Sequence, residues 1–303
     1  MRPQLFVGVL LLCASTSVSH AGTLLPVGSG FSNPQGIALD GSGNVFVADQ
    51  DNNAVKEVLA AGGFTTVNTL GNGFSEPTAV AVAADGNVFV VDAAQSTIKE
   101  ILAAGGYATV TKLGSGFAHP IIGIAVNGVG DVLFADTVGT IQAYSAASNF
   151  TTLSTLASST QFGTCCASAF ALDRAGNVFL VGGTKVEELF ASSGYSTSRS
   201  AGPVGPNTHD NAFHGAATDD AGNLFVGQYE FGVSGGVFAP HVLKLLPSSG
   251  FNYNIVYSPA PPNAIGGIAL SGDTIFLSGA TANAVDEITP VPTPVVLQEF
   301  GVD

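Results

Sequence analysis

The sequence predicts an all-β protein, a six-bladed β-propeller of four-stranded blades, and three observations support this fold. Of the 303 residues, 46% are hydrophobic, which is enough apolar surface for a sizeable core. The 39 glycines break the apolar pattern into short runs. Similar strings recur about every 43 residues with four Val-, Ile-, Phe- and Thr-rich runs per unit, which is typical of a propeller blade.

The first run of each unit starts with Gly or Ala and marks the expected inner strand. The starts are 43, 44, 46, 46 and 52 residues apart, and the copies are GIALD from Gly36, AVAVA from Ala79, GIAVN from Gly123, AFALD from Ala169, GAATD from Gly215 and GIALS from Gly267. Because each blade needs its neighbours, we expect one domain over residues 22–303, and a monomer.

A turn and a second strand follow. Asn or Asp stands eight residues after the first five starts, in strings such as GSGN and ADGN. These strings predict hairpin turns, because Asn and Gly accept positive φ without strain. The next runs, such as VFVAD and VFVVD, lack polar alternation, as expected for strands covered on both faces.

The third strand ends in strings such as VKEVLAAGGF, and the equivalent strings close on Phe64, Tyr107, Phe150, Tyr195 and Phe251. The fourth, outermost strand is expected in TTVNTLGNGF and its equivalents. Thr23 to Phe31 (TLLPVGSGF) resembles these segments but precedes the first blade. We therefore expect it to supply the outer strand of the last blade, with Val295 to Phe300 packed beside it or replacing it.

The N-terminus predicts a secretory signal peptide, residues 1–21. One Arg precedes an apolar run from Leu5 to Ala14, and Ser19-His20-Ala21 offers small residues for cleavage after Ala21. Cleavage of a lipoprotein before Cys13 is the alternative, although Leu12 stands where a small residue is expected. Export to the periplasm or the cell exterior is predicted, with no transmembrane segment, because no later apolar run approaches 18 residues.

The charge excludes some partners. With 22 acidic and 8 basic side chains the net charge is −14, and the basic residues are scattered. Nucleic acid and anionic membranes need clustered Lys and Arg, so neither is expected as a partner.

The repeat also resembles a known family. The pattern P-x-GIA-x-D-x-x-GN-V-F-V-A-D, whole in Pro34 to Asp49 and nearly so in Pro77 to Asp92, is similar to the NHL repeat of six-bladed propellers. The resemblance implies the fold, while propellers of this kind include enzymes, sensor domains and adhesive or scaffolding modules.

One face of the ring is expected to hold the site. The loops into the inner strands and those between second and third strands share a face, and loops on a rigid ring commonly bind ligands. These loops contain or border His119, Cys165, Cys166, His209, Asp210 and His214, together with Asp49, Asp92, Asp136, Glu230 and His241.

His214 is the candidate metal ligand. His214-Gly215 resembles the Pro-His-Gly-Leu segment of peptide-amidating lyases, in which that His ligates zinc, and Glu230 is similar to an acidic residue in virginiamycin B lyase. The resemblance implies a divalent metal acting as a Lewis acid. Glu230 and, from the same face, Asp210 and His119 are the catalytic candidates, and His241 is a further assisting residue. A metal needs three or four ligands, yet the equivalent residues are Gln35, Thr78, Ile122, Ser168, His214 and Gly266. The alternative is a surface His bonded to water or backbone.

Asp49, Asp92 and Asp136 recur at one repeat position, and two interpretations stay open. They are either cation ligands around the channel mouth or acceptors of backbone N–H groups in their own turns. The last three blades have Gly182, Gln228 and Ser278 instead.

Two further features remain ambiguous. The insertion from Gln228 to His241, which includes Tyr229, is either a recognition loop or lid, or a tolerated surface extension. Cys165 and Cys166 form either a vicinal disulfide or two thiols, and no second Cys pair gives them a zinc motif.

The predicted function is binding or scaffolding of a protein, small molecule or glycan through this face. The alternative is a metal-dependent lyase or hydrolase.

Overall fold

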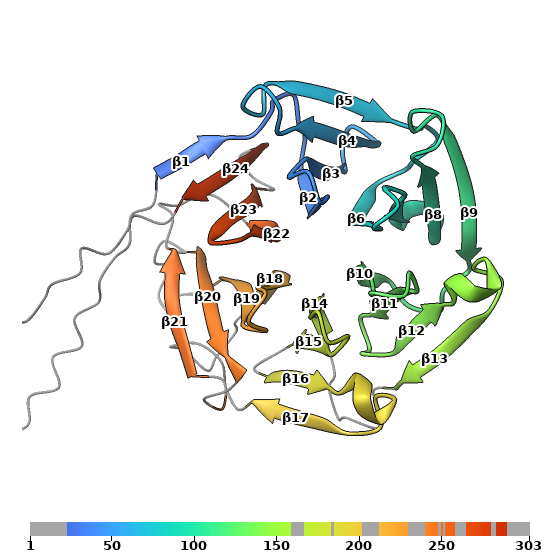
Figure 1. The fold of residues 1–303 in the computed structure, drawn as a ribbon, viewed down its shortest axis with the longest axis vertical. Coiled ribbons are helices and arrows are strands. Elements are labelled where there is room, and N and C mark those ends of the chain that lie inside the picture. The colour runs from blue at the N-terminus through green and yellow to red at the C-terminus, as the bar shows by residue number, and fades with distance from the viewer. Residues whose placement is uncertain are drawn as a thin grey trace, which may run out of the picture.

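The chain folds as a ring of six four-stranded antiparallel sheets, which confirms the predicted β-propeller (Figure 1). The computed structural model describes residues 23–158, 167–182, 185–201, 212–229, 240–247, 250, 252–257, 265–279 and 283–289. Three short 3-10 turns lie wholly within these residues, η1 (Ala93–Gln95), η2 (Ala146–Ser148) and η3 (Ala191–Ser193). Among the same residues, no helix is long and apolar enough to cross a membrane.

The first three blades are complete in the described residues. Blade one has β2 (Pro34–Leu39), β3 (Val45–Asp49), β4 (Ala54–Leu59) and β5 (Thr66–Leu70). Blade two has β6 (Pro77–Val82), β7 (Val88–Asp92), β8 (Thr97–Leu102) and β9 (Thr109–Ser115). Blade three has β10 (Ile121–Val126), β11 (Val132–Asp136), β12 (Ile141–Tyr144) and β13 (Leu153–Ala157).

The remaining blades follow the same order from the channel outward. Blade four has β14 (Ala167–Leu172), β15 (Val178–Gly182), β16 (Lys185–Leu189) and β17 (Ser198–Ala201). Blade five has β18 (Ala212–Thr218), β19 (Leu224–Tyr229), β20 (Pro240–Leu246) and β21 (Asn252–Tyr257). Blade six has β22 (Ile265–Ser271), β23 (Thr274–Gly279), β24 (Ala284–Thr289) and β1 (Thr23–Pro26).

Ring closure follows the prediction, because β1 pairs with β24 as the outer strand of blade six. Blade six then meets blade one, where the Ser278 hydroxyl donates to the Gln35 carbonyl and Asn33 N donates to Asn283 Oδ1. Val295 to Phe300, the alternative closing segment, lies outside the described residues.

The predicted turns tie the two ends of each hairpin together. In blade one, Asp40 Oδ1 accepts from Ser42 N and Asn44 N, and Asn44 Oδ1 accepts from Ala60 N in the turn after the third strand. The Asn87, Asp131 and Asn177 side chains accept the equivalent bond in blades two to four. These bonds explain why Asn or Asp recurs eight residues after the starts of blades one to four.

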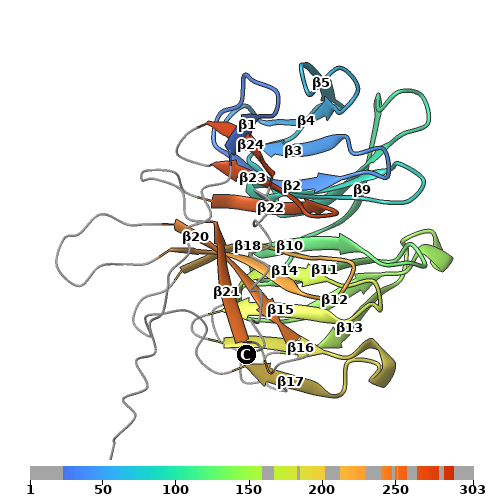
Figure 2. The same cartoon turned by 60° about the vertical axis from the view of Figure 1, so that its left-hand side comes forward.

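Figure 2 shows the blades side by side around the ring. Apolar side chains of neighbouring blades pack against each other and form the core. The aromatic residue after the third strand packs edge-on against a second-strand Phe of the preceding blade, in the pairs Phe64–Phe276, Tyr107–Phe46 and Phe150–Phe89. Phe64, Tyr107 and Phe150 have φ values of 60, 62 and 58°. A bulky residue at positive φ is strained, so this position is held by the contact between blades.

Candidate functional site

Every inner strand has a bulge just before its repeat start, at the same repeat position in five blades and one residue later in blade five. The register between inner and second strand slips after Pro34, Pro77, Ile121, Ala167, His214 and Ile265. A bulge leaves a residue out of the ladder and re-aims its side chain. In blades one to four the bulge therefore leaves Gln35, Thr78, Ile122 and Ser168 out of the ladder, and these residues line the channel.

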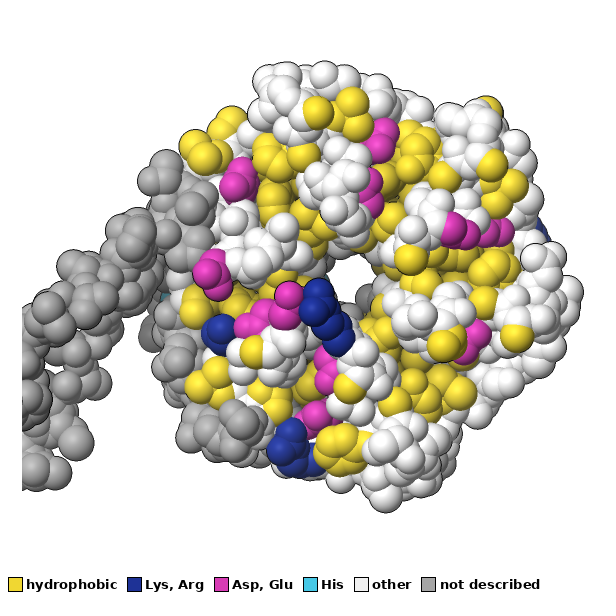
Figure 3. All heavy atoms as spheres, in the orientation of Figure 1, with side chains coloured by type: hydrophobic (Ala, Val, Ile, Leu, Met, Phe, Trp, Pro, Cys, Tyr) yellow, Lys and Arg dark blue, Asp and Glu magenta, His cyan; other side chains and the backbone are white. Residues whose placement is uncertain are grey.

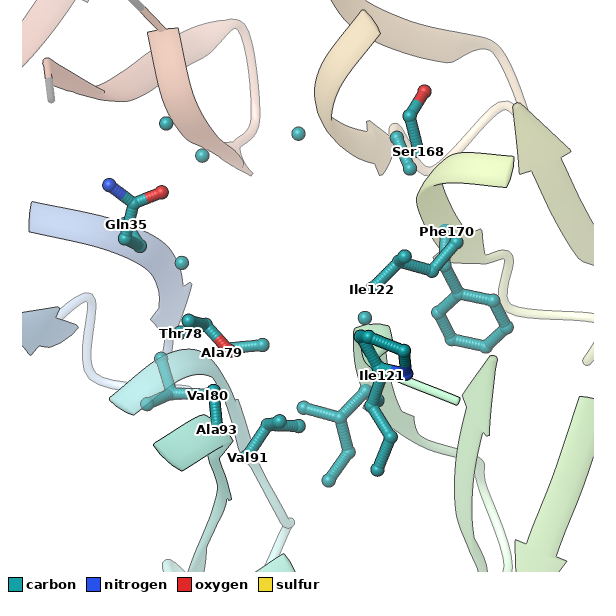
Figure 4. Close-up of a pocket in the computed structure, with 18 of the residues that line it drawn as sticks. Gln35, Thr78, Ala79, Val80, Val91, Ala93, Ile121, Ile122, Ser168 and Phe170 are labelled. Atoms are coloured by element: carbon teal, nitrogen blue, oxygen red, sulfur yellow. The ribbon is translucent and has the colours of Figure 1, made fainter. Parts of the chain in front are cut away.

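One cavity of about 470 Å³ lies at the centre of the ring. Six equivalent residues line it, one from each blade: Gln35, Thr78, Ile122, Ser168, His214 and Gly266. Figure 4 shows Gln35 and Ser168 on opposite sides of the cavity, with Ile121 and Val91 forming an apolar side. The channel also opens on the face that carries the first turns of the blades, where acidic side chains are spread around the ring (Figure 3).

Blade five presents His214 differently from the other blades. Its bulge lies one residue later, so that His214 pairs with Gly227 and the next paired residue is Ala216. Gly215, between them, has φ +68°, and a Cβ there would lie 2.8 Å from Gly267 Cα. A Cβ on Gly227 would lie 2.5 Å from the His214 carbonyl oxygen. Both glycines are therefore needed for this presentation of His214.

The electrostatics of His214 favour a neutral ring. Its side chain is accessible to the channel, yet the surrounding protein atoms desolvate it, and this lowers the pKa of His214 below 6.5. Near neutral pH the imidazole can donate one hydrogen bond and accept one.

The cavity extends from the axis into a recess between blades two and three. One wall comes from the loop into β10, with Phe117, Ala118, His119 and Pro120, and the other from Val91 to Ala93 together with Ser96 and Thr97. His119 is exposed, and it lines the same cavity as His214. Thr97 is 4% exposed, and its hydroxyl has no hydrogen-bond partner among the described residues.

Asp49 and Asp92 are wholly buried and form ion pairs. Asp49 Oδ2 lies 2.6 Å from Lys56 Nζ, and Asp92 Oδ2 lies 2.5 Å from Lys99 Nζ. Their Oδ1 atoms accept from Ser32 N and Ser75 N in the loops that lead into β2 and β6. Asp136 instead accepts from Val138 N and Thr140 N of its own turn.

The insertion in blade five begins and ends on paired strands. Tyr229 pairs with Pro240 and Gln228 with His241 on β19 and β20. Gln228 is fully buried, and neither its amide nor His241 Nδ1 has a hydrogen-bond partner among the described residues. Sequence reasoning missed Gln228 and Thr97 as buried groups, because a motif does not reveal whether a polar atom has a partner.

Several predicted site residues lie outside the described residues: Cys165, Cys166, His209, Asp210 and Glu230. Within the described part of the chain, no three His, Cys, Asp or Glu side chains gather closely enough to hold a metal ion. The residues present there therefore do not make the three- or four-ligand set that a catalytic metal requires.

Comparisons with known proteins agree with the fold. The NHL repeat matches residues 31–57. Virginiamycin B lyase from Staphylococcus aureus is similar over 89% of this chain and 99% of its own, at 12% identity and a TM-score of 0.61. A gluconolactonase from Xanthomonas campestris is similar over 92% and 93%, at 13% identity and 0.60. A chain of a nidogen/laminin complex is similar over 75% and 80%, at 14% identity and 0.60.

No curated protein matches the sequence. The chain is thus a six-bladed propeller with an NHL repeat, and its structural neighbours include both enzymes and a binding complex.

Proposed function

We propose that this propeller is an exported binding module that takes its ligand at the channel mouth, through the cavity lined by His214 and its equivalents. The observation that carries the proposal is the difference among the six ring residues. The residue that follows each of them is always Gly or Ala, whereas the ring residue itself is Gln, Thr, Ile, Ser, His or Gly. Packing keeps the residue after each ring residue small. The ring residues themselves differ, as a specific ligand requires different groups in defined places.

The chemistry of the ring supports a small ligand. Gln35, Thr78 and Ser168 can donate and accept hydrogen bonds, while Ile122 offers apolar contact. A cavity of about 470 Å³ lies within the size range of small-molecule sites.

An NMR titration of the isotope-labelled chain with a library of small fragments tests this proposal. We expect fragment-induced shifts to concentrate on Gln35, Ser168 and His214, and to weaken in His214→Ala but not in Lys112→Ala, which alters an exposed outer strand. Shifts confined to the outer strands, or absent at the channel, would contradict a channel-mouth module.

A metal-dependent lyase or hydrolase is the second candidate, and it is favoured by one observation: His119 and His214 line the same cavity. The fold similarity to virginiamycin B lyase is compatible with it. This candidate depends on Glu230 or Asp210 as further ligand or base. Near-stoichiometric divalent metal in the purified chain, lost in both His214→Ala and His119→Ala, would favour the enzyme; metal indifferent to both would exclude it.

Export is proposed from the N-terminal pattern, an apolar run followed by Ser19-His20-Ala21. N-terminal sequencing of the protein recovered outside the cytoplasm should begin at Gly22. A lipid-modified N-terminus at Cys13 would favour the lipoprotein alternative instead.

A further inference from the structure

The loops into blades one and two are held by the same set of contacts. We call such a loop, from the outer strand of one blade to the inner strand of the next, a crossover. Lys99 Nζ donates to Gly73 O at 2.6 Å and lies 5.3 Å from the centre of the Phe74 ring, while its partner Asp92 accepts from Ser75 N. Lys56 makes the equivalent contacts with Gly30 O and the Phe31 ring. A buried ion pair thus clamps each crossover to the third strand of its blade.

The crossover into blade three lacks this clamp. Ala118 replaces the Ser, Gln142 stands at the Lys position, and Asp136 bonds its own turn. With Ile121, this crossover is one residue longer than the other two. This crossover has a backbone bond from Thr137 N to Pro120 O and an edge-on contact between Phe117 and Phe134.

The cavity reaches into the ring wall at this crossover. Phe117 to Ile121 line it, whereas no equivalent residue of the first two crossovers does. The recess therefore exists where the clamp is missing. Its surface is apolar at Val91, Ala93 and Ile121, with the unpartnered Thr97 hydroxyl among them.

The charges around the recess select against ions. Among the described residues that line the cavity, Asp92 is the one Asp, Glu, Lys or Arg, and it is fully buried against Lys99 and Ser75 N. A charged ligand would lose hydration there without gaining an opposite charge.

We infer that the crossover into blade three is the recognition element of the cavity, and that the recess holds the aromatic or other apolar ring of an uncharged small molecule. This inference rests on the proposed binding function. The Thr97 hydroxyl and the His119 ring supply polar contacts at the edges of the recess, and the ring residues contact the rest of the ligand along the axis.

Three probes with one aromatic ring test the inference: benzamide is uncharged, benzoate is an anion and benzylammonium is a cation. Their dissociation constants are measured by NMR titration of the whole chain near neutral pH. We expect benzamide to bind at least about tenfold more tightly than either ion. Ala93→Phe, which fills the recess, should weaken benzamide binding by about tenfold or more, because overpacking removes the space.

Ala94→Phe is the matched control, since Ala94 is the next residue of η1, is also exposed and does not line the cavity. It should leave benzamide affinity within about twofold. Thr97→Val separates a binding role from a structural one. It should weaken benzamide binding about fivefold without lowering the unfolding midpoint, because the hydroxyl has no partner to lose.

The failures can be told apart. Benzamide affinity that falls in His214→Ala but not in Ala93→Phe would overturn the recess and leave the proposed function standing. Equal or tighter binding of benzoate or benzylammonium would overturn the uncharged ligand. No shift at any channel residue with any probe at millimolar concentration would overturn both the inference and the proposed function.

Discussion

Blades one and two differ from blade three at the crossover, although all three use the same turns, small inner-strand residues and aromatic contacts. In blades one and two a buried Lys–Asp pair joins the third strand to the crossover. In blade three Gln142 and Ala118 break this set, and the cavity extends to the crossover. The comparison teaches that the shared contacts suffice to build a blade, while the clamp decides whether the crossover is available for another role.

Removing the clamp of blade two should have the largest effect. Lys99→Leu leaves the Asp92 carboxylate buried without its cation, and we expect a loss of about 3–5 kcal/mol in the free energy of unfolding. Denaturant unfolding measures it. Lys112→Leu, which changes the exposed residue directly opposite Lys99 on β9, is the control and should change stability by less than about 0.5 kcal/mol.

The double variant Asp92→Gln with Lys99→Leu sharpens the comparison. Blade five has Gln228 and Leu243 at these positions, so the fold accepts an uncharged pair. We expect the double variant to regain most of the stability that Lys99→Leu loses, because no uncompensated charge remains. A double variant as unstable as the single one would mean that the cation, rather than charge balance, holds the crossover.

Much of this framework could be predicted from the sequence. Repetition reveals contacts that every blade makes, such as the Asn44 bond to Ala60 N and the closure by β1. The clamp could not be predicted, because Lys56 and Asp49 are seven residues apart and have the pattern of surface charges in the sequence. The recess could not be predicted for a different reason. It lies where Ala118 and Gln142 do not make the clamp contacts, and a missing contact leaves no motif in the sequence. The one-residue shift of the bulge at His214 depends on Gly215 and Gly227 together, which lie on different strands.

The next largest loss of stability is expected from removing the aromatic contact of blade three. Blade three has no clamp, and Phe150 is one of its contacts with blade two. Its ring lies edge-on to the Phe89 ring, with 5.3 Å between the ring centres. Phe150→Ala should cost about 2–3 kcal/mol, below the value for a fully buried Phe because Phe150 is half-buried.

Phe150→Gly should be more stable than Phe150→Ala by about 1 kcal/mol, because residue 150 has φ 58° and only Gly adopts it without strain. Thermal unfolding of the two variants side by side measures the difference. An Ala variant more stable than the Gly variant would show that the strain at this turn is not retained in solution.

The pH dependence of stability tests the channel side of the comparison. Burial lowers the pKa of His214 below its unfolded value near 6.5, so the unfolded chain takes up a proton first as the pH falls. The contribution of His214 to stability is therefore complete above about pH 6.5 and is lost as the pH falls toward the folded pKa. His214→Gln should lose less stability than the parent between about pH 7.5 and pH 5.5.

Thermal unfolding at both pH values measures this difference. Burial raises the pKa of Glu100 and of Asp286, so these two groups change stability with pH in the opposite direction to His214. Both groups are present in parent and variant, so their effects cancel in the comparison. Identical pH profiles would mean that His214 is as well hydrated in the folded channel as in the unfolded chain.

The smallest effect is expected from an ion pair that resembles the clamp only in its distance. Arg174 and Asp220 join the first turns of blades four and five at 3.0 Å, but their side chains are 78% and 74% exposed. Water screens this pair and both side chains lose entropy when it forms, so Asp220→Asn should change the free energy of unfolding by less than about 0.5 kcal/mol. The same denaturant series that includes Lys99→Leu measures it. If Asp220→Asn were as costly as Lys99→Leu, burial would not be what separates the clamped crossovers from the rest of the ring.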